Sequence, residues 1–390
     1  MAESDAPSTR VVCEGALIGS DVSKRPGRRF VALDAWRGIA ALMVIAYHLP
    51  LTAAAPLGPL WQHGYLFVDF FFALSGFVLA WVYGESLRDR RNLGPFLWRR
   101  LARVYPLHLV TLLPFVVVVA LGLMPDAFRA ADHQWSDLGW SATLLYGLED
   151  LGHGWNVPSW SISTEWWSYV LFALLVPLGR TRMAAVIAVV AAIVLVVRWE
   201  GLIAAANIER TALGFTLGVL ARDVYRALVT RWSPAGATAL EVAVVATTLV
   251  GVMALGGTWA ECLLPVLFTC AVLVFAKGQG ALSRALSGGV GKALGRLSFG
   301  AYLHHHFVVL VVTWAAIELG LVVGLTRPGQ ALPVAGGLPE LLGLAAVVFP
   351  VTIGLAWLTE RTIERPLYRW ARARVGLHPV PRRADPTPPE

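Results

Sequence analysis

Residues 34–48 read DAWRGIAALMVIAYH, and this stretch decides the fold class. It is apolar enough to enter a membrane, yet it carries the ionisable side chains Arg37 and His48. These two residues are eleven positions apart, so an α-helix places both on one face, about 16 Å apart along its axis. Ionisable side chains inside a membrane helix are costly and are usually functional. The alternative is an interfacial arginine and a histidine that only packs against a neighbouring helix.

The composition of the chain is that of a membrane protein. Hydrophobic residues make up 57% of the 390 residues and charged residues only 15%, whereas a soluble domain is about a quarter charged. Long apolar runs occupy residues 107–123, 183–197 and 341–358. We therefore predict an all-α, polytopic bundle of transmembrane helices. The N-terminal ten residues are polar, and no apolar stretch precedes a cleavage site, so we expect no cleaved signal peptide.

Basic residues predict the topology of this bundle. We expect ten transmembrane helices, at residues 33–54, 66–83, 104–123, 159–178, 183–198, 202–220, 238–256, 259–276, 297–319 and 340–359. With residue 1 in the cytoplasm, the cytoplasmic segments and the mouth of the first helix hold 28 of the 32 Lys and Arg residues. This asymmetry follows the positive-inside rule and predicts that both termini are cytoplasmic. The net charge of +7 is therefore a topology signal and does not indicate nucleic-acid binding.

The chain divides into three parts. Residues 1–29 form a basic cytoplasmic arm that we expect to be flexible, and residues 30–370 form the ten-helix membrane domain. Residues 371–390 form a Pro-rich cytoplasmic tail that we expect to be disordered. The three cysteines are too sparse for a disulfide framework or a zinc site. The sequence determines no oligomeric state.

Polar side chains enter the bundle at further positions. Glu165 shares a helix face with Ser161 and Tyr169. A carboxylate at this depth needs a cationic or hydrogen-bonding partner, and His48 or Arg37 is the natural one. A purely structural pairing of Glu165 is the alternative. Asp69 lies among phenylalanines, so we expect it to point into the bundle and to make a structural hydrogen bond.

Three consecutive histidines, His304, His305 and His306, lie in the ninth predicted helix. Side chains of consecutive helical residues diverge by about 100°, so the three cannot chelate one ion well. We predict no metal site. We expect one histidine to face the interior of the bundle, another to face a neighbouring helix and the third to pack.

The longest predicted outer loop, residues 125–158, is rich in tryptophan and acidic residues. Indole rings beside carboxylates suit the binding of sugar rings, and we expect Trp155, with Trp160 just beyond the loop, to contact substrate. The alternative is an interfacial belt of tryptophans. On the cytoplasmic side, Arg100 and Arg103 lie one helical turn apart and suit an anionic group such as a phosphate. Topology alone also explains basic residues there.

Several motifs together resemble the membrane-bound acyltransferase family 3, which includes O-acetyltransferases of bacterial surface polysaccharides. In chain order they read LDAWRGIAALMVIAYH, VDFFFALSGFVL, RRLARVYPLH, SWSISTEW, LGRLSFGAYLHH and IERP. The resemblance covers about residues 30–370. It implies a bacterial inner-membrane enzyme, surrounded by lipid, that transfers an acyl group, commonly acetyl. The donor is cytoplasmic acyl-CoA, and the acceptor is a hydroxyl of a carbohydrate, glycolipid or metabolite.

The resemblance also implies roles for individual residues. Arg37 and His48 match the family's Arg and His in the first helix, and Arg100 and Arg103 match its Arg-x-x-Arg motif. Glu165 and His305 match an acid and a histidine of later motifs. We expect His48 to act as general base and Glu165 to orient its imidazole. We expect His305 or Tyr302 to donate to the oxyanion, and the CoA donor to be bound by Arg37, Arg100 and Arg103. A two-step route through acyl-His48 is an alternative to direct transfer.

Two other classes of protein use similar residues. Intramembrane His, Glu and Arg also build proton relays, so a proton-coupled transporter of an acylated or sugar-like solute is the main alternative. No inverted repeat with paired broken helices is visible in the sequence. A non-catalytic envelope scaffold is a further alternative, and it does not explain why Arg37, His48 and Glu165 cluster.

Overall fold

The computed structural model describes residues 30–50, 58–123, 135–148, 154–179, 206–228, 232–324, 334–335 and 337–377. The longer helices are α1 (Val31–Tyr47), α3 (Val68–Tyr83), α4 (Leu93–Ala120), α7 (Trp160–Leu175), α9 (Ala206–Ala227), α10 (Pro234–Leu255), α11 (Leu264–Lys277), α13 (Gly289–Glu318) and α14 (Leu338–Thr359). The shorter α-helices are α2 (Pro59–Gln62), α6 (Trp135–Ala142), α12 (Ala281–Leu286) and α15 (Arg365–Arg374). Single turns of 3₁₀-helix include Gly64–Phe67, Val157–Ser159 and Trp259–Leu263, and a π-helical turn, Glu360–Glu364, joins α14 to α15.

The predicted helical class is confirmed, with one small exception. Two-residue strands, β1 (Val323–Gly324) and β2 (Val334–Ala335), pair antiparallel beyond the end of α13. Helix α15 continues to Arg374, three residues past the predicted start of the tail at residue 371. Tyr368 and Ala371 are buried on the inner face of α15, and this burial keeps the chain helical. The arm, residues 1–29, and residues 378–390 lie outside the described part of the chain.

Six helical segments of the described chain are long and apolar enough to cross a membrane. They are Gly64–Tyr83, Arg90–Ala120, Pro234–Leu255, Trp259–Lys277, Gly289–Glu318 and Leu338–Arg374. Each coincides with one of the ten predicted spans. Three further predicted spans contain helices that fall short: α1 has 17 residues and α7 has 16, and α9 carries several charged residues along its 22. The predicted span 183–198 lies outside the described residues, so ten spans and cytoplasmic termini stay predictions.

Large apolar side chains on the outer helices face away from the protein. Examples are Leu113 and Val117 on α4, Val250 on α10, and Val347 on α14, all of which are exposed. In water such surfaces would favour aggregation, whereas in a bilayer they contact acyl chains at little cost. This distribution supports a multi-pass membrane protein.

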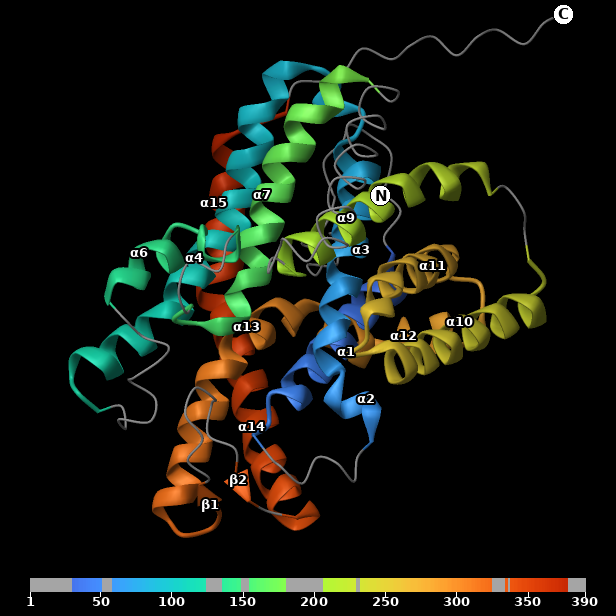
Figure 1. Ribbon diagram of the computed structural model, residues 1–390. Coiled ribbons are helices and arrows are strands. Elements are labelled where there is room, and N and C mark those ends of the chain that lie inside the picture. Colours follow the sequence, from blue (N-terminus) through green and yellow to red (C-terminus); the bar gives the residue numbers. More distant parts are fainter. Residues whose placement is uncertain are drawn as a thin grey trace, which may run out of the picture.

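Helices α1 and α13 are in direct backbone contact near the centre of the bundle (Figure 1). A Cβ atom added at Gly38 would lie 2.5 Å from Cβ of Leu294, and one at Gly295 would collide with the carbonyl oxygen of Asp34. Glycine is therefore required on both sides, because any side chain would push the helices apart. This close packing brings the end of α1 against the middle of α13, where His48 and His305 lie.

Helices α3 and α9 form a second close pair. Added Cβ atoms at Gly76 and Gly218 would collide with the carbonyl oxygens of Phe215 and Ala73, respectively. This pair also joins Asp69 of α3 to Arg210 of α9, whose Nε donates to Asp69 Oδ1 at 2.9 Å. The prediction that Asp69 points into the bundle is confirmed, since only 1% of it is exposed.

Candidate active site

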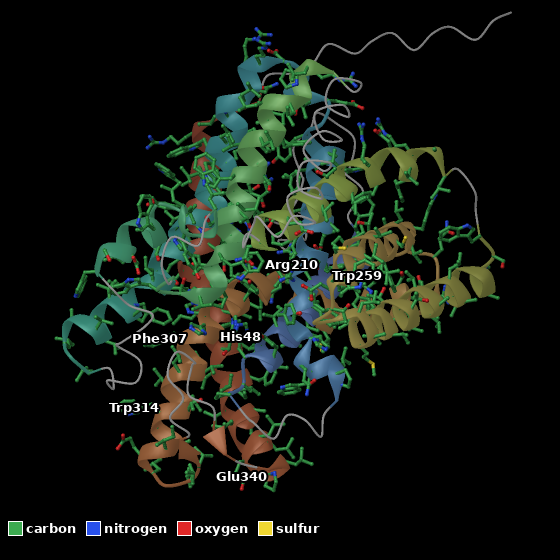
Figure 2. All side chains as sticks on the ribbon, viewed as in Figure 1. His48, Arg210, Trp259, Phe307, Trp314 and Glu340 are labelled. Carbon is green, nitrogen blue, oxygen red and sulfur yellow. The ribbon has the colours of Figure 1, made fainter. Side chains whose placement is uncertain are left out.

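The central feature of the site is a contact between two imidazoles. His48 caps the C-terminal end of α1, and its Nδ1 lies 3.3 Å from Nε2 of His305 on α13, with ring centroids 4.8 Å apart. His305 is fully buried, while His48 is only partly buried. Figure 2 labels His48 near the middle of the bundle, where α1 meets α13.

Backbone carbonyls identify the tautomers of both rings. His48 Nδ1 lies 2.8 Å from the carbonyl oxygen of Val44, and His305 Nδ1 lies 2.5 Å from that of Tyr302. A carbonyl oxygen can only accept, so we assign the proton of each ring to Nδ1. The Nδ1 proton of His48 points at the carbonyl oxygen of Val44 and is shared, over the longer distance of 3.3 Å, with Nε2 of His305. His48 Nε2 keeps its lone pair. Among the described residues, no hydrogen-bond partner occupies that nitrogen.

The three consecutive histidines diverge as their helical spacing predicts. His305 faces His48. The Nε2 atom of His304 lies 3.2 Å from Oγ1 of Thr359 on α14, and His306 stacks on Phe115 of α4, with centroids 5.9 Å apart. His305 is therefore the histidine of this run that meets the first helix most closely. No group of three metal-ligating side chains that could hold an ion occurs in the described part of the chain.

A cavity between α1, α3, α4, α7 and α13 reaches Tyr302, whose ring contacts that of His305 with centroids 5.6 Å apart. Its polar lining consists of Arg37, Ser75, Arg100, Arg103, Ser161, Glu165, Tyr169 and Tyr302. The three arginines predicted to bind one ligand therefore do converge, although Arg37 and Arg100 are 63 positions apart. Three guanidinium groups and one carboxylate line the cavity among the described residues, and guanidinium groups are suited to an anionic ligand.

Each arginine is positioned by its own contacts. Arg103 pairs with Glu364 at 2.9 Å and lies over the ring of Phe299, 5.1 Å from its centroid. Arg100 donates to the hydroxyl of Tyr83 at 2.9 Å. Arg37 lies 4.0 Å from Asp34, one turn away on α1. These partners hold the guanidinium groups in place before any ligand binds.

Glu165 has a partner that the sequence did not predict. Its carboxylate accepts a short hydrogen bond from Ser75 on α3. Among the described residues, the imidazole of His48 contacts Val44 and His305, and Glu165 does not reach it. The expected Glu165–His48 contact is therefore wrong for this structure, because α7 packs on α4 and α9, and Glu165 points into the cavity that Arg37 also lines.

Tyr302 connects the cavity to the imidazole pair. Its hydroxyl lines the cavity, donates to the carbonyl oxygen of Pro158 at 3.0 Å and lies 2.8 Å from the hydroxyl of Ser161. Its own carbonyl oxygen accepts the proton of His305 Nδ1. A single residue of α13 thus contacts both the cavity and the partner of His48.

The two predicted tryptophans lie apart from the cavity. Trp155 is fully buried against Leu112 and Phe115 and contacts Trp135, with ring centroids 5.1 Å apart. Trp160 is half-buried and has the guanidinium of Arg210 over its ring at 5.6 Å. Neither lines the cavity, and their roles in binding substrate stay predictions.

Sequence reasoning missed Ser75 and Glu364 as parts of the site. Both lie in motifs that it did recognise, VDFFFALSGFVL and IERP. Ser75 is the only hydroxyl-bearing side chain of its motif, and Glu364 is an acid beside an arginine-rich helix start. These signals identify candidates, but the partners come from helices 90 and 261 positions away and depend on tertiary packing.

Comparisons with known proteins connect this geometry to one chemistry. The family model described as "Acyltransferase domain" matches residues 30–361. The chain is 35% identical to acyltransferase MdmB of Streptomyces mycarofaciens over 166 residues, which cover 37% of this chain and 39% of that protein. It is 28% identical to exopolysaccharide production protein ExoZ of Rhizobium meliloti over 320 residues, which cover 79% of this chain and 90% of that protein. No solved structure matches.

Proposed function

This chain belongs to acyltransferase family 3, and we propose that it transfers an acyl group from acyl-CoA to a hydroxyl of a carbohydrate, glycolipid or small metabolite. We assign it to the bacterial inner membrane, where lipid surrounds its apolar helices. The observation that carries the proposal is the lone pair of His48 Nε2, connected through His305 and Tyr302 to a cavity that collects three arginines. A basic nitrogen and an anion-binding space are the two requirements of transfer from CoA.

His48 is the general base in this proposal. Its Nε2 removes the proton of the acceptor hydroxyl while that oxygen attacks the thioester carbonyl. The C–S bond breaks, and the departing CoA sulfur takes the proton from the imidazolium. Imidazole suits both steps near neutral pH, and such proton transfer contributes roughly 10²–10⁴ in rate.

His305 positions this base. Its Nε2 accepts from His48 Nδ1, and this hydrogen bond strengthens when His48 becomes an imidazolium. His305 therefore both orients the ring and stabilises its charged form, the role first expected of Glu165. We keep Glu165 as a catalytic candidate that acts inside the cavity, where its carboxylate lies with Arg37 and Ser75.

Arg37, Arg100 and Arg103 bind the donor. CoA carries phosphate groups, and guanidinium groups form strong, often bidentate hydrogen bonds with phosphates. When CoA binds, Arg103 either releases Glu364 and binds a phosphate oxygen in its place, or keeps Glu364 and binds the phosphate with its remaining N–H groups. Tyr302 and His305 both remain oxyanion candidates, because each directs its proton at a backbone carbonyl in this structure, that of Pro158 and that of Tyr302, respectively. Of the two, Tyr302 is the one that lines the cavity.

The names of the similar proteins guide the choice of acceptor. ExoZ is described as an exopolysaccharide production protein, and the chain covers most of its length. This similarity favours a saccharide hydroxyl over other acceptors. The match to MdmB covers less than half of that protein, so it supports acyl transfer in general.

The test uses the purified protein in lipid nanodiscs with acetyl-CoA and a panel of hydroxyl acceptors. We expect release of CoA thiol that depends on the acceptor, together with an acetylated product in the mass spectrum. Mass spectrometry of surface glycans from cells with and without the gene identifies the natural product and its acyl mass. Uptake of solute into proteoliposomes without CoA release would instead indicate a transporter.

A further inference from the structure

A row of rings leads from His48 to the start of α7. Tyr47 contacts His48 with ring centroids 4.9 Å apart, and Tyr65 contacts Tyr47 at 5.3 Å. The guanidinium of Arg210 then lies over both Tyr65, at 5.2 Å, and Trp160, at 5.6 Å. We call Tyr47, Tyr65, Arg210 and Trp160 the aromatic row, and Figure 2 labels Arg210 and His48 near its two ends.

The aromatic row and Arg100 lie at opposite ends of the bundle, although the cavity that Arg100 lines also extends along α3 to Val68. Helix α3 connects the two ends: Asp69 at its start pairs with Arg210, and Tyr83 at its end bonds Arg100. Sixteen helical residues span about 24 Å. A ligand on the row therefore lies far from the phosphates of the donor, yet its near end reaches the imidazole that acts as base.

The charge of Arg210 in the aromatic row is balanced by Asp69, and both side chains have polar atoms that form no hydrogen bond among the described residues. Arg210 and Asp69 form an ion pair in which both side chains are at most 10% exposed, so no net charge remains. Arg210 uses Nε for Asp69 and Nη2 for the carbonyl oxygen of Tyr65, which leaves Nη1 without a partner among the described residues. Buried Asp69 Oδ2 also lacks a hydrogen bond within the described part of the chain. Such a balanced pair disfavours an anionic ligand and suits hydroxyl groups, which both donate and accept.

The outer edge of the row is open. Tyr47, Tyr65 and Trp160 are all only partly buried. Tyr65 donates to Glu261 at 2.8 Å, and Trp259, two residues before this acid, is 80% exposed. Flat rings beside carboxylates and guanidinium groups present an apolar face with polar groups at its rim, the combination that a pyranose ring needs.

We propose that the aromatic row is the acceptor subsite and that it binds an uncharged saccharide ring, with one hydroxyl directed at His48 Nε2. This inference rests on the proposed acyl transfer and assigns its acceptor to a place and a chemical class. Trp160, expected from the sequence to contact substrate, belongs to this subsite. Trp155, buried on the far side of α4, does not.

The experiment measures acetyl transfer by the nanodisc protein to methyl glycosides of neutral hexoses, with methyl glucuronide as the charged comparison and glycerol as the non-saccharide acceptor. We expect transfer to at least one neutral glycoside. Replacing Trp160→Ala should raise the KM for that glycoside about tenfold, equivalent to roughly 1.4 kcal/mol of lost binding, without changing the KM for acetyl-CoA. Trp160→Phe should recover most of the loss, and Trp166→Ala on the same helix is the matched control.

Different failures of this experiment overturn different claims. Transfer to glycerol but to no glycoside, or a preference for the glucuronide, would overturn the subsite and leave the acyl transfer standing. An unchanged glycoside KM in Trp160→Ala would do the same. If no acceptor releases CoA, the proposed function fails, and direct binding decides the subsite. Tryptophan fluorescence of His48→Ala must then respond to a neutral glycoside, and the response must be lost in His48→Ala with Trp160→Ala; equal responses would contradict the subsite.

Discussion

Nε2 of His305 lies 3.3 Å from Nδ1 of His48 and shares the proton of that nitrogen with the carbonyl oxygen of Val44. Two carbonyl oxygens, those of Val44 and Tyr302, produce this arrangement because each accepts the Nδ1 proton of one ring. The base of the proposed reaction is thus oriented by a second imidazole on another helix. Contact between α1 and α13 through glycine makes the distance possible.

Replacing His305→Gln should lower kcat about 10- to 100-fold, the usual cost of removing the partner that orients a functional imidazole. The KM for acetyl-CoA should stay unchanged, because His305 does not line the cavity. His304→Gln is the matched control on the adjacent position, where the partner is Thr359. Steady-state kinetics with varied acetyl-CoA separates the two effects. Equal losses in both variants would mean that His305 only supports the fold.

Replacing Arg100→Ala or Arg103→Ala should raise the KM for the donor by roughly 10- to 100-fold, because a hydrogen bond to a charged group contributes about 1.5–3 kcal/mol. The KM for the acceptor should change little. Arg91→Ala removes a charge near the start of the same helix, where the guanidinium is exposed and pairs with Asp89, and should have no effect. A similar rise in the donor KM in all three variants would mean that positive charge in general, and not these two arginines, attracts the donor.

Replacing Gly38→Ala should destabilise the protein by about 1–3 kcal/mol, because the new methyl group overlaps Leu294 on α13. Gly354→Ala on α14 meets nothing within 4 Å and should be neutral or slightly stabilising, since alanine favours helix. Thermal unfolding in detergent, followed by light scattering, compares the two. Equal melting temperatures would contradict the close contact between α1 and α13.

Glu85, in the turn between α3 and α4, should make the stability of the protein depend on pH. Burial alone would raise the pKa of Glu85, but the hydrogen bond and charge of Arg226, with the charge of Arg222, hold that pKa below its usual range. A carboxyl group whose pKa is lower when folded stabilises the protein above its unfolded pKa, near 4.3, and loses this contribution as pH falls further.

The melting temperature of the wild type should therefore exceed that of Glu85→Gln at pH 7, and the gap should narrow below about pH 4.3. Thermal scans of both proteins across this range provide the measurement. If the difference in melting temperature between the two proteins does not change with pH, then Glu85→Gln lowers stability for a reason unrelated to the charge of Glu85.

Local patterns predicted the parts of this site that lie on one helix or repeat a family motif. The helical period places Arg37 and His48 on one face, and the divergence of three consecutive histidines leaves His305 facing inward. The convergence of Arg37, Arg100 and Arg103 was expected from the family resemblance and is found in the cavity.

Contacts between distant helices could not be predicted in the same way. Glu165 meets Ser75 because α7 and α3 both pack on α9, and nothing in either segment selects a serine over a histidine as partner. The number of membrane spans is also hard to count from hydropathy, because it too depends on packing between helices. Short or charged helices such as α1 and α9 are stabilised by close packing inside the bundle, and so their length and apolarity fall below what an isolated span needs.

The most direct test of the central claim compares wild type with His48→Ala in nanodiscs, measuring CoA release from acetyl-CoA and, separately, acetyl-CoA binding by equilibrium dialysis. His108→Ala, which removes a buried histidine that bonds Ser141 on the far side of α4, is the control. We predict that His48→Ala loses acetyl transfer by about 10²–10⁴ while binding the donor as tightly as wild type. Full acetyl transfer by His48→Ala would contradict the account.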